Sequence, residues 1–139
     1  METKNNYKSF NKGKTIDELQ YNMFQNIAIL KAFKTDYEFI KHLIEASIYK
    51  PNTRNLFEIL QQYKKEIELA DSELILLIEE ATNNNNKIAQ KIEYNDLECD
   101  SLCIEKFDVL EQKFHTFFYK TINSKRQMFE YLHSVIKIC

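Results

Sequence analysis

The fold is decided by residues 15–49, which read TIDELQYNMFQNIAILKAFKTDYEFIKHLIEASIY. Apolar side chains recur here every three or four residues, the spacing that gathers them along one side of an α-helix. Counted in heptads, the first position of the repeat is held by Ile16, Met23, Leu30, Tyr37 and Ile44. A seven-residue repeat kept over the whole stretch predicts a long helix that packs lengthwise against other helices, as in a coiled coil.

Both ends of this helix are marked in the sequence. Thr15 and Glu18 have the spacing of a capping box, in which each side chain accepts a hydrogen bond from the backbone N–H of the other residue. Pro51 closes the stretch, because a residue that precedes proline avoids the helical conformation. The helix is therefore expected from about residue 15 to about residue 49.

Two further stretches repeat the pattern. In the second, the apolar seam consists of Leu56, Leu60, Tyr63, Ile67, Ala70, Leu74, Leu77, Ala81 and Ile88. In the third, it consists of Phe107, Leu110, Phe114, Phe117, Thr121, Ser124, Met128, Tyr131, Val135 and Ile138. These seams predict two more helices, one from residues 52–55 to about residue 95 and one that begins near residues 96–101.

Four consecutive asparagines leave the course of the second helix open. Asparagine is a poor helix former, so the helix is weakened at Asn83, Asn84, Asn85 and Asn86. The preferred interpretation is one continuous helix. The alternative is a break at these asparagines, which would give a four-helix bundle with a short third helix.

The composition favours few turns and therefore long helices. The chain has one glycine and one proline, the residues on which the tight turns of sheets depend. Helices joined by short connections are antiparallel neighbours. The sequence thus predicts an all-α, antiparallel up-down-up bundle of three long helices over residues 15–139, preceded by a flexible basic tail over residues 1–14. The predicted core includes Leu30, Phe33, Tyr37, Leu60, Ile67, Leu110, Phe114 and Phe117.

Charge and hydropathy argue against several function classes. The net charge is −2 and the second helix is acidic, which disfavours binding to nucleic acid. No apolar run approaches the ~20 residues of a membrane span, and the first residues lack the apolar centre of a signal peptide. Three cysteines without such a signal predict free thiols in a cytoplasmic or otherwise intracellular, reducing compartment.

Few residues suggest chemistry. The three histidines, His42, His115 and His133, are expected at outward heptad positions, and Cys139 is too far from Cys99 and Cys103 to share a metal site with them. A single glycine, Gly13, excludes a glycine-rich phosphate loop. The sequence therefore predicts no metal and no cofactor.

One pair of residues supports an alternative function. Arg126 and His133 are separated by six residues in the segment RQMFEYLH. This pattern resembles the motif of HEPN-type ribonucleases, in which an arginine and a histidine four to six residues apart meet across a dimer to cleave RNA without a metal. The resemblance implies catalytic roles for Arg126 and His133. That family commonly has Asn, Asp or His after the arginine, whereas this chain has Gln127.

The second helix has more apolar side chains than one seam requires. Residues 74–78 read LILLI, and only Leu74 and Leu77 belong to the seam. A helix that is apolar on all sides is buried on all sides. We therefore expect an interaction surface formed by Leu69, Ile75, Leu76 and Ile78, with a polar rim of Glu66, Asp71, Glu73, Glu79 and Glu80.

These patterns lead to one functional interpretation. The chain is expected to be a non-catalytic helical module that binds another protein, or itself, through its second helix. A subunit of a larger assembly, an adaptor and a small immunity or antitoxin-type protein all fit this description.

Overall fold

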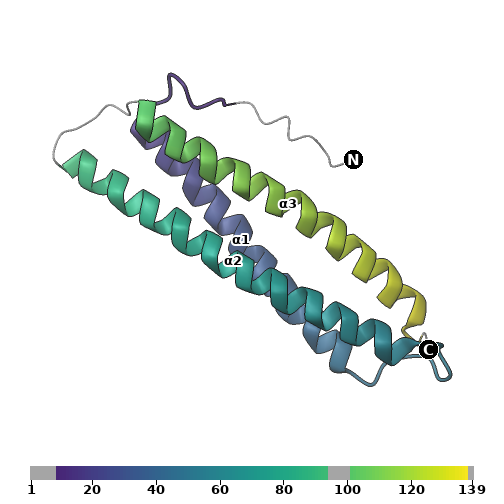
Figure 1. Ribbon diagram of the computed structural model, residues 1–139. Coiled ribbons are helices and arrows are strands. Elements are labelled where there is room, and N and C mark those ends of the chain that lie inside the picture. Colours follow the sequence, from purple (N-terminus) through teal and green to yellow (C-terminus); the bar gives the residue numbers. More distant parts are fainter. Residues whose placement is uncertain (1–8, 94–100, 138–139) are drawn as a thin grey trace.

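The computed structural model describes residues 9–93 and 101–137, the side chains at 91–93, 101 and 102 excepted. It contains the helices α1 (Ile16–Glu45), α2 (Leu56–Glu93) and α3 (Ser101–Val135). They lie side by side in an elongated bundle, with α1 and α3 running in one direction and α2 in the other (Figure 1). The predicted all-α, up-down-up architecture is confirmed. None of the helices, over the described residues, is long and apolar enough to cross a membrane.

The start of α1 follows the sequence, but its end does not. The Glu18 backbone N–H donates to the Thr15 hydroxyl (3.1 Å), and the Thr15 N–H donates to the Glu18 carboxylate (2.8 Å), as the capping box predicts. The helix ends at Glu45, earlier than expected, because the chain that follows pairs with the end of α3. Tyr49 forms an antiparallel bridge with Ile136 there.

Two asparagines turn the chain from α1 into α2. Asn52 and Asn55 have φ angles of 64° and 58°. Asparagine tolerates this left-handed conformation better than most residues because its short side chain bonds locally to the backbone. Helix α2 begins directly afterwards, at Leu56.

The run of four asparagines does not interrupt α2, so the preferred interpretation is confirmed. Asn85 is buried, with 3% of its surface exposed, and its amide donates to the backbone carbonyl of Gln20 on α1 (3.3 Å). The Gln20 amide donates in return to the carbonyl of Asn85 (3.3 Å). Contacts with a neighbouring helix thus support α2 where its own helix propensity is lowest.

The core is continuous from one end of the bundle to the other. All eight residues predicted from the heptads to be in the core are buried. At the middle level, the buried side chains are Leu30, Phe33, Leu74, Leu77, Phe114 and Phe117. Towards one end, burial raises the pKa of Tyr37 above its usual value, although the hydroxyls of Thr121 and Ser124 act in the opposite direction.

Part of the predicted tail is anchored to α3. Asn11 is fully buried, and its amide donates to the carboxylates of Asp108 (2.7 Å) and Glu111 (3.0 Å). A turn at Gly13 (φ 87°) then leads into α1. Within residues 9–14 the chain is thus held against α3 at Asn11. The flexible tail over residues 1–14 stays a prediction, and residues 1–8 lie outside the described part of the chain.

The prediction of free thiols is wrong at Cys103. This residue is buried and disulfide-bonded, whereas Cys99 and Cys139 lie outside the described residues. Disulfides are uncommon in reducing compartments. The cysteines therefore no longer support a reducing location.

Candidate interaction surface

Helix α3 stands farther from the other two helices than they stand from each other. The backbones of α1 and α2 make many close contacts, whereas α3 makes few with either. Its buried seam contains three phenylalanines, and large side chains increase the distance between helix axes. These are Phe107, Phe114 and Phe117.

Side chains fill the space between α3 and α1. The ring of Phe118 stacks on Phe33, with centroids 5.6 Å apart. Lys125 lies over the same Phe33 ring at 4.5 Å and pairs with Asp36 at 2.5 Å. These contacts bridge α3 and α1 at the level of Phe33.

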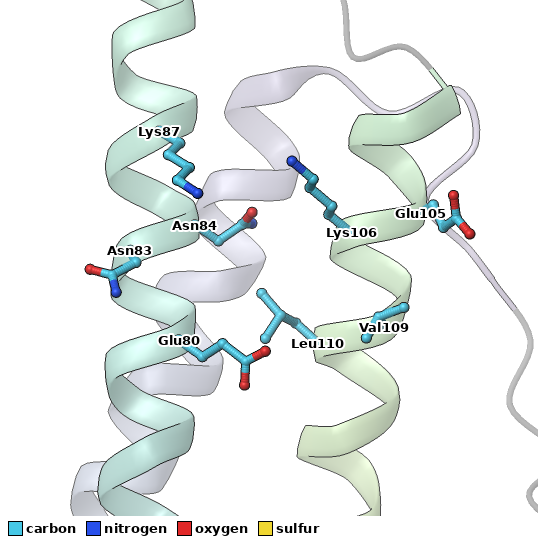
Figure 2. Close-up of a pocket in the computed structure, with 8 residues that line it drawn as sticks. All are labelled: Glu80, Asn83, Asn84, Lys87, Glu105, Lys106, Val109 and Leu110. Atoms are coloured by element: carbon cyan, nitrogen blue, oxygen red, sulfur yellow. The ribbon is translucent and has the colours of Figure 1, made fainter.

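The space between α3 and α2 remains an open groove. One part is lined by Glu73, Leu76, Leu77, Glu80, Val109, Gln112, Lys113 and Thr116. The adjoining part is lined by Glu80, Asn83, Asn84, Lys87, Glu105, Lys106, Val109 and Leu110. Figure 2 shows that Leu110, Asn84 and Lys106 point into the space between the two helices, with α1 behind. Because both parts share Glu80 and Val109, they form one groove.

Two ion pairs cross this groove. Lys120 contacts Glu73 at 2.8 Å, and Lys113 contacts Glu80 at 2.9 Å. All four side chains are about half exposed, so each pair adds little to stability. They show, however, which residues of α2 and α3 lie opposite each other along the bundle.

The predicted apolar surface is divided in the structure. Leu69 and Leu76 are 74% and 64% exposed, and Leu76 lines the groove. Ile75 is 41% exposed and lies about 100° further around α2 than Leu76. Ile78 is half-buried and packs against the core. Only the two leucines therefore form a strongly exposed surface on the α3 side.

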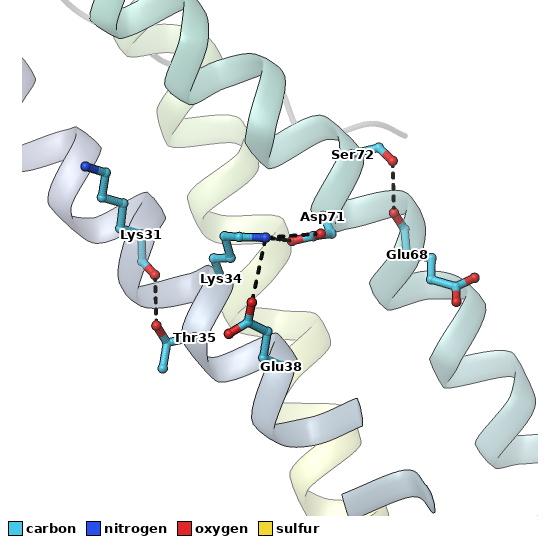
Figure 3. A network of polar contacts seen from close by, with 7 residues as sticks. All are labelled: Lys31, Lys34, Thr35, Glu38, Glu68, Asp71 and Ser72. Carbon is cyan, nitrogen blue, oxygen red and sulfur yellow. Dashed lines mark hydrogen bonds and ion pairs between the residues drawn. The ribbon is translucent and has the colours of Figure 1, made fainter. Parts of the chain in front are cut away.

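The predicted acidic rim is also divided. Asp71 accepts from Lys34 on α1 (3.4 Å), which also contacts Glu38 (3.8 Å), and Glu68 points away from this contact (Figure 3). Glu66 is half-buried and accepts from Gln62, while Glu79 is exposed and has no ion-pair partner in the described part of the chain. Some of the acidic groups are thus neutralised within the bundle and others are not.

Helix α3 contributes apolar residues that sequence reasoning missed. Val109 lines the groove and is 47% exposed, and Tyr119 is 67% exposed. Both are off the seam of α3, which is the signal that could have identified them. We call the groove together with its flanking residues Leu69, Leu76, Val109, Tyr119 and Arg126 the α2–α3 face.

Arg126 and His133 are both exposed on α3, one heptad apart. Neither lines the groove. Two lysines precede Arg126 on α3, and both are paired: Lys120 with Glu73 and Lys125 with Asp36. Most of the local positive charge is therefore neutralised by the protein itself.

The three histidines are exposed, at the outward positions expected for them. Over the described ranges, no three histidine, cysteine, aspartate or glutamate side chains are grouped so that they could hold a metal ion.

Comparison of this chain with models of known protein families, with curated proteins and with solved structures found no match.

Proposed function

We propose that this protein is a non-catalytic helical module that binds another protein chain through the α2–α3 face. The observation that carries the proposal is the exposure of Leu69 and Leu76 beside an open groove. Burying one leucine side chain contributes roughly 1.5–3 kcal/mol compared with leaving it in water. A partner that covers both leucines would therefore gain several kcal/mol from them alone.

The groove suits a helical partner. Leu76, Leu77 and Val109 provide apolar contact along it, and the Glu80–Lys113 pair supplies charge at its edge. An amphipathic helix binds such a groove through apolar residues on one side, while charges at the edge determine register and partner choice. A subunit, an adaptor and an immunity-type protein all need such a face.

The experiment is chemical cross-linking of the full chain in the cells that produce it, followed by quantitative mass spectrometry. The wild-type chain should be cross-linked to a protein chain, its own or another, and the Leu69→Glu/Leu76→Glu variant should lose that product. The matched control is Phe24→Glu, which changes a 54% exposed residue on α1, away from the face. Equal cross-linking by all three chains would contradict the proposal.

The ribonuclease alternative rests on one observation, that Arg126 and His133 are exposed on the same side of α3. Cleavage would require these residues to meet their counterparts across a dimer. Incubation of the purified chain with RNA in EDTA separates the two functions, because only the ribonuclease would produce fragments.

A further inference from the structure

We propose that the α2–α3 face binds a second copy of this chain, with α2 of each copy lying on α3 of the other. This inference rests on the proposed function and names the partner. It follows from the distribution of charge on the two helices, from the ways in which two such faces can meet, and from the area that they offer.

The charges of the two helices are segregated on this face. Between residues 66 and 80, every charged side chain of α2 is acidic. Between residues 113 and 126, α3 contains three lysines and one arginine, and no aspartate or glutamate. The ion pairs Glu73–Lys120 and Glu80–Lys113 show that these two stretches lie at the same level of the bundle. Over these two stretches the α2 side of the face is therefore acidic and the α3 side is basic, whereas the adjoining part of the groove is lined by Lys87 on α2 and Glu105 on α3.

Two copies can bring such faces together in two symmetric ways. If α2 lies on α2, acidic residues oppose acidic residues, and like charges across an interface are unfavourable. If the twofold axis runs parallel to the helices, α2 of each copy lies on α3 of the other, and the level of each residue is kept. This second arrangement places acidic opposite basic in both halves and closes as a dimer.

The same arrangement supplies partners for side chains that lack them. Glu73 lies opposite Lys120, and the two helices are antiparallel, so Glu66, seven residues earlier, lies at the level of residue 127. In the dimer, Glu66 is therefore close to the level of Arg126 of the second copy. Among the described residues, Arg126 makes no ion pair. At the centre, the exposed leucines Leu69 and Leu76 lie near the level of Tyr119, whose ring stacks on His115 and is held in place.

The face is large enough for a stable dimer. Helix α3 has 35 residues and is therefore about 50 Å long, and two adjacent helices are about 20 Å wide. The face thus measures about 1,000 Å² on each copy. A standard protein–protein interface buries about 800 Å² on each partner.

The experiment is sedimentation analysis of the purified full chain at about 1–100 μM. The wild type should be a dimer, Leu76→Glu should raise the dissociation constant by about 100-fold or more, and Leu69→Glu should act in the same way. Phe24→Glu is the matched control and should remain dimeric. Circular dichroism should show unchanged helix content for all three variants, because each residue is more than half exposed.

A charge exchange tests the arrangement itself. Glu66→Arg and Arg126→Glu should each weaken the dimer by about 10-fold, and the double variant should recover most of that loss. A double variant as weak as the single variants would overturn the α2-on-α3 arrangement. A wild-type monomer at every concentration would overturn the second copy as partner, and the proposed function would still stand if Leu76→Glu abolished cross-linking to a different protein.

Discussion

Asn11 is fully buried although it precedes the first helix, so its replacement by alanine tests how the N-terminal segment is held. Its amide donates to Asp108 (2.7 Å) and Glu111 (3.0 Å). A hydrogen bond to a charged acceptor contributes about 1.5–3 kcal/mol. The sum of two such bonds is an upper limit, because both carboxylates regain water once the segment detaches. We expect Asn11→Ala to lower the free energy of unfolding by about 2 kcal/mol.

Urea unfolding followed by circular dichroism measures this loss, which corresponds to a fall in Tm of about 6 °C for a chain of this size. Limited proteolysis should also cut the variant earlier within residues 9–14. The control is Ser9→Ala. The exposed Ser9 hydroxyl donates to Asp108 and accepts a long bond from the Asn11 N–H (3.4 Å), and its loss should cost only about 0.5 kcal/mol because water replaces both partners. If Asn11→Ala matched the wild type in both measurements, the anchoring contact would be wrong.

The variant Asn11→Asp should make the stability of the folded chain depend on pH in a direction that can be stated in advance. The shape is kept, but the new carboxylate lies beside those of Asp108 and Glu111, so its pKa is raised in the folded chain. A raised pKa lowers stability at neutral pH, and the loss disappears as the pH falls through that pKa towards the unfolded value of about 4. The stability gap between Asn11→Asp and Asn11→Ala should therefore shrink from pH 7 to pH 5. A gap that did not change would contradict the arrangement of the three groups.

Four further predictions follow from the bundle. Phe114→Ala should cost about 3–5 kcal/mol in denaturant unfolding, because the ring is buried between the helices. Asn85→Ala should lower the free energy of unfolding by about 1 kcal/mol, because the bond to α1 is lost. Asn86→Ala, at an exposed position, should raise it by about 0.5 kcal/mol, because alanine is the better helix former. Because burial raises the pKa of Tyr37, the free energy of unfolding should fall as the pH rises above about 10, as urea unfolding at pH 9 and 11 would show. Arg126→Ala and His133→Ala should leave the free energy of unfolding unchanged, and the wild type should not cleave RNA in EDTA. If the wild type did cleave RNA and His133→Ala did not, the ribonuclease function would be favoured.

The repeat of each helix was predictable because it depends on that helix alone. The apolar spacing of residues 15–49 already identified Leu30, Phe33 and Tyr37 as core residues, and all three are buried. The start of α1 was predictable for the same reason, since Thr15 and Glu18 satisfy each other within one turn. Local periodicity and local capping need no knowledge of the neighbouring helices.

Features that depend on distant residues were not predictable in this way. Asn85 looked like a weak point of α2, but its side-chain amide and its backbone carbonyl both bond to Gln20 on another helix. Asn11 looked like part of a mobile tail, and its acceptors stand nearly a hundred residues later in the chain. The early end of α1 likewise results from pairing with Ile136. In each case the local structure is set by contacts with residues far away in the chain.

The position of the groove follows from which side chains flank the seam of α3. Towards α1, the flanking positions hold Phe118, whose ring stacks on Phe33, and Lys125, whose ammonium group lies over the same ring and pairs with Asp36. Towards α2, they hold Lys113 and its equivalents one heptad away, whose charged ends stay in water because burying a charge is costly. A seam of large phenylalanines separates α3 from both neighbours. On the α1 side the ring of Phe118 reaches Phe33, whereas on the α2 side Leu76 and Val109 line the groove without filling it. The open side is therefore also the side with segregated charge, and for that reason it is the side on which a partner is expected.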